Sequence, residues 1–352
     1  MSENALSSSD NSTQRVPPRT RYTSLWFADG NVVLLCSAAQ GDMDETAFRI
    51  HRSILSHHSK VFKDMFSVGE GANEDSDMMD GCPVVRVQDK ADDMANLLRR
   101  LYSLESREVR KSPSLELISS IMGLASKYIM EGLRQELVDD LLNIFPTSLD
   151  DYMNSSLSPS PDNPLLGIDI GLKYELPAII PTACYRAALL DEKKIFDGFR
   201  LSDGTSTVSV SARALCMRFK TRLGLWINGW TGTFAREERP YFLPNDHRCD
   251  TYSPYGRMCN GISAYRNESL AMMYGDFKLD FFSDDEQQYY DHESTESYDD
   301  VPCRSCLSFV RDAGGDFREA AWKLLPKFCD LEDWDALLGR AADRDSDPED
   351  AY

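Results

Sequence analysis

Short apolar runs in the first part of the chain predict β-strands. The runs at residues 25–28 and 31–36 stand on either side of an Asp-Gly pair, and two apolar runs joined in this way predict a β-hairpin. Residues 47–50 and 83–87 contain Val, Ile and Phe, which favour a pleated, half-buried backbone. We therefore expect a hairpin and further short strands, which together make a small β-sheet.

Apolar side chains recur at helical spacing over much of the remaining chain. We expect helices at residues 51–66, 92–102, 115–130, 133–142, 165–174, 182–190, 213–226 and 317–325, the last of them ended by Pro326. Residues 69–81 and 228–310 lack a clear period, so we expect a loop and an irregular region there. The pattern predicts an α/β (α+β) domain followed by a mainly helical C-terminal region.

Changes in composition divide the chain further. Ser, Asn and Pro are frequent at the N-terminus, Ser and Pro recur around residues 154–164, and acidic residues dominate two later segments. We expect a disordered N-terminus at 1–20, the α/β domain at 21–150, a Ser/Pro linker at 151–167, a mainly helical region at 168–340 with an acidic insertion at 283–300, and an acidic tail at 341–352.

Charge and hydropathy narrow the classes of partner. The formal net charge is −20, with 58 acidic against 38 basic residues, whereas nucleic-acid binding depends on Lys and Arg that neutralise phosphates. The longest aliphatic run, Val32 to Leu35, is far shorter than the roughly 20 residues of a membrane helix. The N-terminus also lacks an apolar stretch of signal-peptide length. We expect an intracellular protein of the cytoplasm or nucleus that binds neither nucleic acid nor membrane directly.

The sequence offers little for catalysis. It contains 5 histidines and none of the common hydrolase, metalloprotease or phosphate-loop motifs. Adjacent acidic pairs are more often solvated helix surface than catalysts. We therefore expect a protein that is not an enzyme, and a zinc-dependent hydrolase is the alternative from another class, which needs an open metal site beside a carboxylate base.

The cysteines leave one cofactor question open. The count is 9, an odd number, so free or metal-bound thiols are expected in an intracellular chain rather than a disulfide framework. Cys303 and Cys306 have the spacing of half a zinc site, and Cys249 and Cys259 could supply the other half, with His247 in reserve. The alternatives are a closed structural zinc site and ordinary buried thiols. No other cofactor is expected.

Two stretches of the N-terminal part resemble the BTB/POZ domain family. The resemblance to the signature F-x-V-H-R/K-x-x-L…S-x-x-F is carried by Phe48, His51, Arg52, Leu55, Ser59 and Phe62. The later family pattern A-x-K-Y…L is matched by Ala125, Lys127, Tyr128 and Leu133. The resemblance implies a protein-interaction domain that self-associates and recruits partners.

The rest of the chain is similar to BTB proteins abundant in mushroom-forming (basidiomycete) fungi. The opening W-F-x-D-G of those proteins resembles residues 26–30, and their G-L-P…P-A-A-x-Y helix resembles residues 176–177 and 181–185. Their closing C-x-x-C…W-x-x-L-P-x-F-x-L-x-x-W segment resembles residues 303–334. The resemblance is sharp over the first 145 residues of the sequence and looser after them.

The resemblance and the apolar pattern indicate a partner-binding surface. Self-association is expected to use Leu25, Trp26, Phe27, Ile54 and Leu55, which one small domain need not bury fully. Many BTB domains pair an Asp after the first strand with the Arg that follows the signature His. Here those positions are Asn31 and Arg52, beside His51. His51 either lines a partner groove or satisfies a backbone group at the helix start.

A second partner motif follows the signature helices. Some BTB domains bind a cullin scaffold through a hydrophobic-x-Glu motif, which Val68 and Glu70 resemble in position and type. The alternative is an ordinary acidic, Gly-rich loop. The resemblance thus implies a substrate adaptor of a cullin-RING ubiquitin ligase, or alternatively a transcriptional co-regulator.

Overall fold

The computed structural model divides into two compact units, Met1–Leu137 and Val138–Tyr352. It describes residues 19–36, 45–69, 77–154, 163–198, 208–236, 282 and 304–345. In the part of the chain that the structure describes, no helix combines the length and the apolar character that crossing a membrane requires.

A mixed 5-stranded sheet forms the centre of the first unit. Its strands are β1 (Arg19–Trp26), β2 (Val32–Cys36), β3 (Glu45–Ile50), β4 (Met78–Met79) and β5 (Cys82–Val87), in the spatial order β1-β3-β2-β5-β4. β2 pairs antiparallel with β3 and parallel with β5, and every residue of β2 is buried. A continuous apolar run is expected where both faces of a strand are covered.

The predicted hairpin of residues 25–28 and 31–36 is wrong. β3 lies between β1 and β2, and β1 runs parallel to β3. A tight turn does form, because the Gly30 amide donates to the Phe27 carbonyl at 3.1 Å, but the flanking amides of Phe27 and Asn31 donate to β3. A Cβ at position 30 would stand 2.9 Å from the Arg49 side chain. The glycine therefore permits close approach to β3 rather than pairing of β1 with β2.

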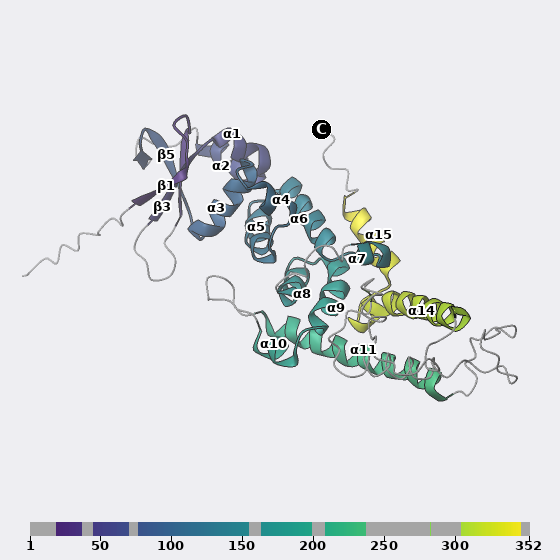
Figure 1. Cartoon of the computed structure of the whole chain (residues 1–352). Coiled ribbons are helices and arrows are strands. Elements are labelled where there is room, and N and C mark those ends of the chain that lie inside the picture. The colour runs from purple at the N-terminus through teal and green to yellow at the C-terminus, as the bar shows by residue number, and fades with distance from the viewer. Residues whose placement is uncertain are drawn as a thin grey trace, which may run out of the picture. The chain divides into compact units, whose positions relative to one another are not determined.

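The helices of the first unit come between β3 and β4 and after β5 (Figure 1). They are α1 (Arg52–His58), α2 (Lys60–Gly69), α3 (Ala91–Leu101), α4 (Arg107–Lys111), α5 (Leu115–Lys127) and α6 (Glu131–Ile144), of which α6 continues into the second unit. The expected helix at 51–66 is two helices, because Ser59 adopts an extended backbone between them. The expected loop at 69–81 contains the short strand β4.

The core of the first unit joins the sheet to these helices. The fully buried side chains include Leu34, Phe48, Ile50, Leu55, Phe62, Met94, Leu97, Leu98, Ile118 and Met122. They come from β2, β3, α1, α2, α3 and α5. Burial of such aliphatic and aromatic side chains is the main stabilising contribution to a domain of this kind.

The second unit is helical, as expected. It contains α7 (Leu149–Asn154), α8 (Pro164–Lys173), a short 3-10 helix η2 (Pro177–Ile179), α9 (Ile180–Ala188), α10 (Glu192–Asp197), α11 (Val210–Arg236), α14 (Arg304–Phe328) and α15 (Trp334–Asp345). Every residue of α9 is buried, and α9 contacts α8, α11 and α14. α9 is thus the central helix of this unit.

Several boundaries in the second unit differ from expectation. α8 begins at Pro164, within the expected linker, because the Asn163 side chain accepts a hydrogen bond from the Leu166 amide and proline suits the first helical position. α14 begins at Arg304, and Pro326 lies inside its last turn instead of ending it. α15 extends past residue 340, into the expected acidic tail. In the first unit, β1 begins at Arg19, inside the segment 1–20 that was expected to be disordered.

Close packing of α8 depends on two glycines. A Cβ at Gly167 would stand 2.3 Å from the Phe145 ring, and one at Gly171 would stand 2.6 Å from the Ile180 side chain. Real Cβ atoms do not approach other atoms so closely, so larger residues would displace α8. Glycine at these positions therefore allows α8 to pack directly on its neighbours.

Basic side chains of α11 bind the C-terminal ends of three other helices. Arg213 donates to the Phe196 carbonyl at 2.7 Å, Lys220 to the Leu190 carbonyl at 3.2 Å, and Arg222 to the Phe328 carbonyl at 3.0 Å. Carbonyls at helix C-termini lack intrahelical partners and carry partial negative charge. These basic side chains of α11 therefore stabilise the C-terminal ends of α10, α9 and α14.

Candidate functional site

The junction of β3 with α1 carries the signature residues of the first unit. The Asn31 side-chain oxygen accepts a hydrogen bond from the Arg52 backbone amide at 2.8 Å, so it satisfies one of the free N–H groups at the start of α1. The Arg52 guanidinium donates to the Phe66 carbonyl at 3.0 Å and lies over the Phe66 ring. Asn31 therefore binds the Arg52 backbone, while the Arg52 side chain contacts Phe66.

His51 lies between a hydroxyl and a carboxylate. Its Nδ1 is 3.0 Å from the Tyr102 hydroxyl, and its Nε2 is 3.3 Å from a carboxylate oxygen of Asp29. The pKa of Asp29 is lowered, first by a hydrogen bond from its own backbone and then by the one from His51. Phe27 stacks on the Tyr102 ring at 4.7 Å. The His51 ring thus contacts the side chains of Tyr102 and Asp29. The free backbone amide at the start of α1 is satisfied by Asn31 and not by His51.

Ser59 connects the signature helices to α5. Its hydroxyl donates to the Tyr128 carbonyl at 2.6 Å and accepts from the Phe62 amide at 3.1 Å, while Phe62 stacks on Tyr128 with ring centroids 4.5 Å apart. The Tyr128 hydroxyl donates to Asp89, and burial together with this bond raises its pKa. Ser59 and Phe62 of the signature and Tyr128 of the later family pattern are therefore structural.

The residues expected to drive self-association divide into two groups. Leu25 and Leu55 are fully buried within the chain itself, so they belong to its core and are not available to a partner. Trp26, Phe27 and Ile54 are partly exposed. These three apolar side chains, which lie around the end of β1 and on α1, are therefore the accessible part of the predicted surface.

An apolar stripe runs along α2. Val68 is 80% exposed and Met65 is 36% exposed, and the partly buried Val61 precedes them at helical spacing. Phe62 and Phe66 on the same helix are buried. Val68 therefore presents its side chain to solvent, as a partner anchor requires. Glu70, the second residue of the predicted motif, lies outside the described residues.

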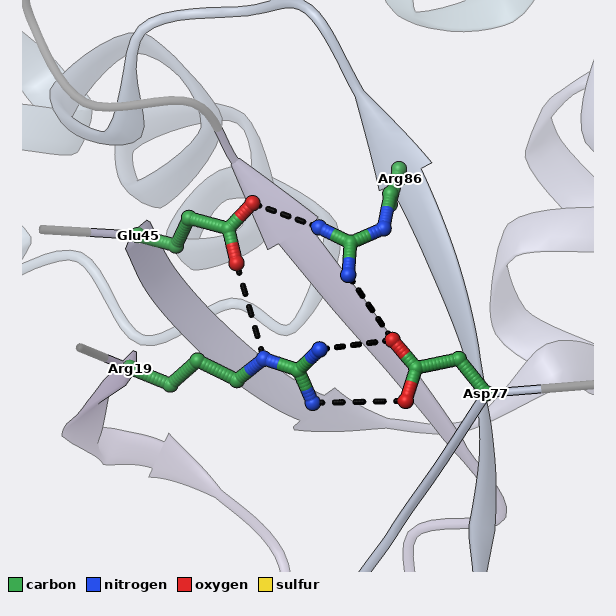
Figure 2. Close-up of polar contacts among 4 residues, drawn as sticks. All are labelled: Arg19, Glu45, Asp77 and Arg86. Carbon is green, nitrogen blue, oxygen red and sulfur yellow. Dashed lines mark hydrogen bonds and ion pairs between the residues drawn. The ribbon is translucent and has the colours of Figure 1, made fainter. Parts of the chain in front are cut away.

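The structure adds a charged cluster that the sequence pattern did not indicate. Figure 2 shows Arg19, Glu45, Asp77 and Arg86 arranged so that each carboxylate contacts both guanidinium groups. The distances include 2.6 Å from Arg19 to Asp77 and 2.5 Å from Arg86 to Glu45. A hydrogen bond to Asp77 raises the pKa of Arg19, and the same bond lowers that of Asp77.

This cluster links β1, β3 and β5 with the residue that precedes β4. Its charges cancel within the cluster, so it offers no excess charge to a ligand. Arg21, which is two positions after Arg19 on β1, also pairs with Asp80. Arg19 and Arg21 are two positions apart, so they lie on the same face of β1. This spacing is the only sequence signal for the charged cluster, because the acidic partners are far away in the sequence.

The predicted zinc ligands are not tested by this structure. Cys249, Cys259 and Cys303 lie outside the described residues, and Cys306 falls in α14 at a position whose side chain is not described. Over the described ranges, no group of three or more His, Cys, Asp or Glu side chains could hold a metal. The described free cysteines are all buried, namely Cys36, Cys82, Cys184, Cys216 and Cys329.

Comparison with known proteins assigns residues 31–144 to a domain family. The family model for the BTB/POZ domain matches residues 31–144, which run from the residue before β2 to the end of α6. No curated protein matches the chain. β1, with Trp26, precedes the matched span. Residues 31–144 are thus a BTB/POZ domain, a protein-interaction module with a mixed sheet, and a helical C-terminal region follows it.

Proposed function

We propose that this chain self-associates through its BTB/POZ domain and recruits partner proteins to a cullin-RING ubiquitin ligase as a substrate adaptor. The family match makes protein interaction the general role. The observation that carries the finer proposal is the exposed stripe of α2, in which Val68 is 80% exposed. An apolar side chain held out from a helix is the kind of anchor that fills a pocket on a partner.

The cullin scaffold is the proposed occupant of the α2 stripe. Val68 supplies the apolar contact, and Met65, one turn earlier, extends it. Truncation of a buried interface valine to alanine costs about 1–2 kcal/mol, which is roughly a 5- to 30-fold increase in Kd. The substrate is then bound by a different part of the chain.

Binding of purified full-length protein to a recombinant cullin N-terminal region, measured by titration calorimetry, tests this part. Val68→Ala should weaken binding by the stated factor. Val210→Ala is a matched control, because Val210 is 73% exposed but lies on α11 in the second unit, and it should leave Kd unchanged. Absence of cullin binding by the wild type, or equal effects of the two variants, contradicts the proposal.

Self-association is proposed to use the accessible residues Trp26, Phe27 and Ile54. Light scattering of the full chain over a micromolar concentration range should give twice the monomer mass. Ile54→Glu places a charge in the proposed interface and should restore the monomer. Lys60→Gln, on the exposed start of α2, changes the net charge by the same single unit and is the control for the charge change. A monomer mass for the wild type at every concentration refutes self-association.

A further inference from the structure

The turn between α4 and α5 contains an exposed serine that precedes a buried proline. Ser112 is exposed, and Pro113 after it is buried. Ser112 is the residue that ends α4, with φ −143° and ψ 76°, so its backbone has left the helical region, as is usual for a residue before proline. Pro113 therefore anchors the turn to the rest of the domain, while Ser112 remains accessible to solvent.

The Ser112 hydroxyl has no structural task of the kind that its neighbours have. The Ser106 and Ser114 hydroxyls accept hydrogen bonds from backbone amides and so cap α4 and α5. Within the described ranges the Ser112 hydroxyl makes no hydrogen bond. Only the Ser112 backbone amide is bonded, because it donates to the Glu108 carbonyl at 3.1 Å. Modification of this hydroxyl therefore breaks no hydrogen bond of the described part of the domain.

α4 can open at low cost. The helix has five residues and none of them is buried, and a helix of this length is unstable in water without packing. Segments with few buried apolar contacts open locally with little free energy. An enzyme that binds its substrate in an extended form can therefore reach Ser112 without unfolding the domain.

Three exposed cations of α4 can neutralise a phosphate at Ser112. They are Arg107, Arg110 and Lys111, and none of them pairs with a carboxylate among the described residues. Arg107 is three and four positions before the other two, so the like charges share one helix face and repel one another. A phosphoserine close to such a cluster gains charge-assisted hydrogen bonds. α4 has three basic residues and one acidic residue, so the roughly two negative charges of a phosphate cancel its net charge.

We infer that Ser112 is a phosphorylation site for a proline-directed protein kinase. Over the described ranges, Ser112 is the only serine or threonine that is followed by proline. The kinase transfers the γ-phosphoryl group of ATP to Ser112. A bond from the Ser112 Oγ to phosphorus forms, the bond from phosphorus to the leaving ADP oxygen breaks, and a carboxylate of the kinase takes the hydroxyl proton. Phosphorylation removes the basic character of the α4 surface, and this inference is independent of the proposed cullin contact.

Incubation of the full chain with ATP and a recombinant mitogen-activated protein kinase, followed by peptide mass spectrometry, tests this inference. Further Ser-Pro pairs occur at 158–161 and 253–254, so the readout is the phosphate on the peptide that contains Ser112. A synthetic peptide of residues 106–118 is the unfolded reference substrate. The native chain should be phosphorylated at Ser112 at more than about one tenth of the rate of this peptide, because α4 opens easily.

Ser112→Ala should remove the phosphate from this segment. Ser114→Ala is the matched control, because Ser114 is an exposed serine that is not followed by proline, and phosphorylation of Ser112 should persist in that variant. After kinase treatment, the wild type and Ser112→Ala should have the same urea midpoint, since the phosphate breaks no hydrogen bond.

Three results overturn the inference. The first is phosphorylation of the native chain at less than one tenth of the peptide's rate, which means that the fold protects Ser112. The second is a lower urea midpoint for the phosphorylated wild type than for the treated Ser112→Ala chain, which means that the folded domain does not accommodate the phosphate. The third is the absence of phosphate from Ser112 in both the peptide and the chain.

Discussion

Ser59→Ala is the substitution that tests most directly how the BTB/POZ domain is held together. The Ser59 hydroxyl is buried and makes two hydrogen bonds, one to the Phe62 amide at the start of α2 and one to the Tyr128 carbonyl at the end of α5. Alanine removes both bonds without adding volume. The change in the free energy of unfolding therefore reports the loss of these hydrogen bonds and not a change in packing.

The expected magnitude is the sum of two effects. Loss of a serine that caps a helix N-terminus costs about 1 kcal/mol. Loss of a buried hydrogen bond costs about 1 kcal/mol more, and the Tyr128 carbonyl that remains without this donor adds to that. We expect Ser59→Ala to lower the free energy of unfolding by about 2–3 kcal/mol, a large part of the roughly 5–15 kcal/mol of a typical domain.

Hydrogen exchange with mass spectrometry on the full chain is the assay, because it reports the free energy of opening of each segment. Peptides from α2 and from the end of α5 should both exchange faster in Ser59→Ala. Ser114→Ala is the matched control, since Ser114 is an exposed serine that only caps α5, and it should cost about 1 kcal/mol. If the two variants cost the same, the Ser59–Tyr128 bond does not stabilise the domain and the reasoning is refuted.

Three further predictions concern packing, pH and thiol reactivity. Gly167→Ala should destabilise the chain by about 1–3 kcal/mol, because its Cβ would stand 2.3 Å from a packed ring, whereas Gly132→Ala, with open space around it, should stabilise it by about 0.5–1 kcal/mol; urea unfolding of both variants measures the opposite signs. Asp77→Asn should lower stability at neutral pH, because a hydrogen bond from Arg19 holds the pKa of Asp77 below its ordinary value. This contribution is full above about pH 3.9 and is lost as pH falls through the lower folded pKa, so urea midpoints of variant and wild type should converge in acid; a constant difference contradicts it. Burial raises the pKa of Cys36 to about 12, so iodoacetamide at pH 8 should leave this thiol unmodified in the native chain and alkylate it in urea, as peptide mass spectrometry would show; alkylation of native Cys36 contradicts it.

Helices were the elements that the sequence predicted best. The pattern at residues 115–130 corresponds to α5, and that at 92–102 corresponds to α3, because long amphipathic periods are set by local spacing. Short helices such as α4 and α10 were missed, since one or two turns contain too few apolar positions for a period. The break at Ser59 was also missed, because the apolar period continues across it, and the bond that Ser59 makes joins it to Tyr128, far away in the sequence.

The site residues were predicted with less success, for a related reason. The resemblance to a hydrophobic-x-Glu motif singled out Val68 in a loop after the signature helices, whereas the structure places it within α2 with an exposed side chain. Apolar character alone could not separate Leu25 and Leu55, which are buried in the core, from Trp26 and Ile54, which are partly exposed. That distinction depends on which neighbouring elements cover each side chain, and a single sequence does not contain it.

The sequence by itself determined the class of this protein. The apolar period is a local property, so it sufficed to predict an α/β domain and a helical region after it, and the resemblance of the signature residues indicated the family. The tertiary structure decided the strand order, because β1 pairs with β3 through backbone groups that carry no residue-specific signal. It alone also decided that Asn31 binds the Arg52 backbone, and that Phe282 lies among rings from three helices. These contacts join residues distant in the chain, and their energies depend on geometry that only the folded state creates.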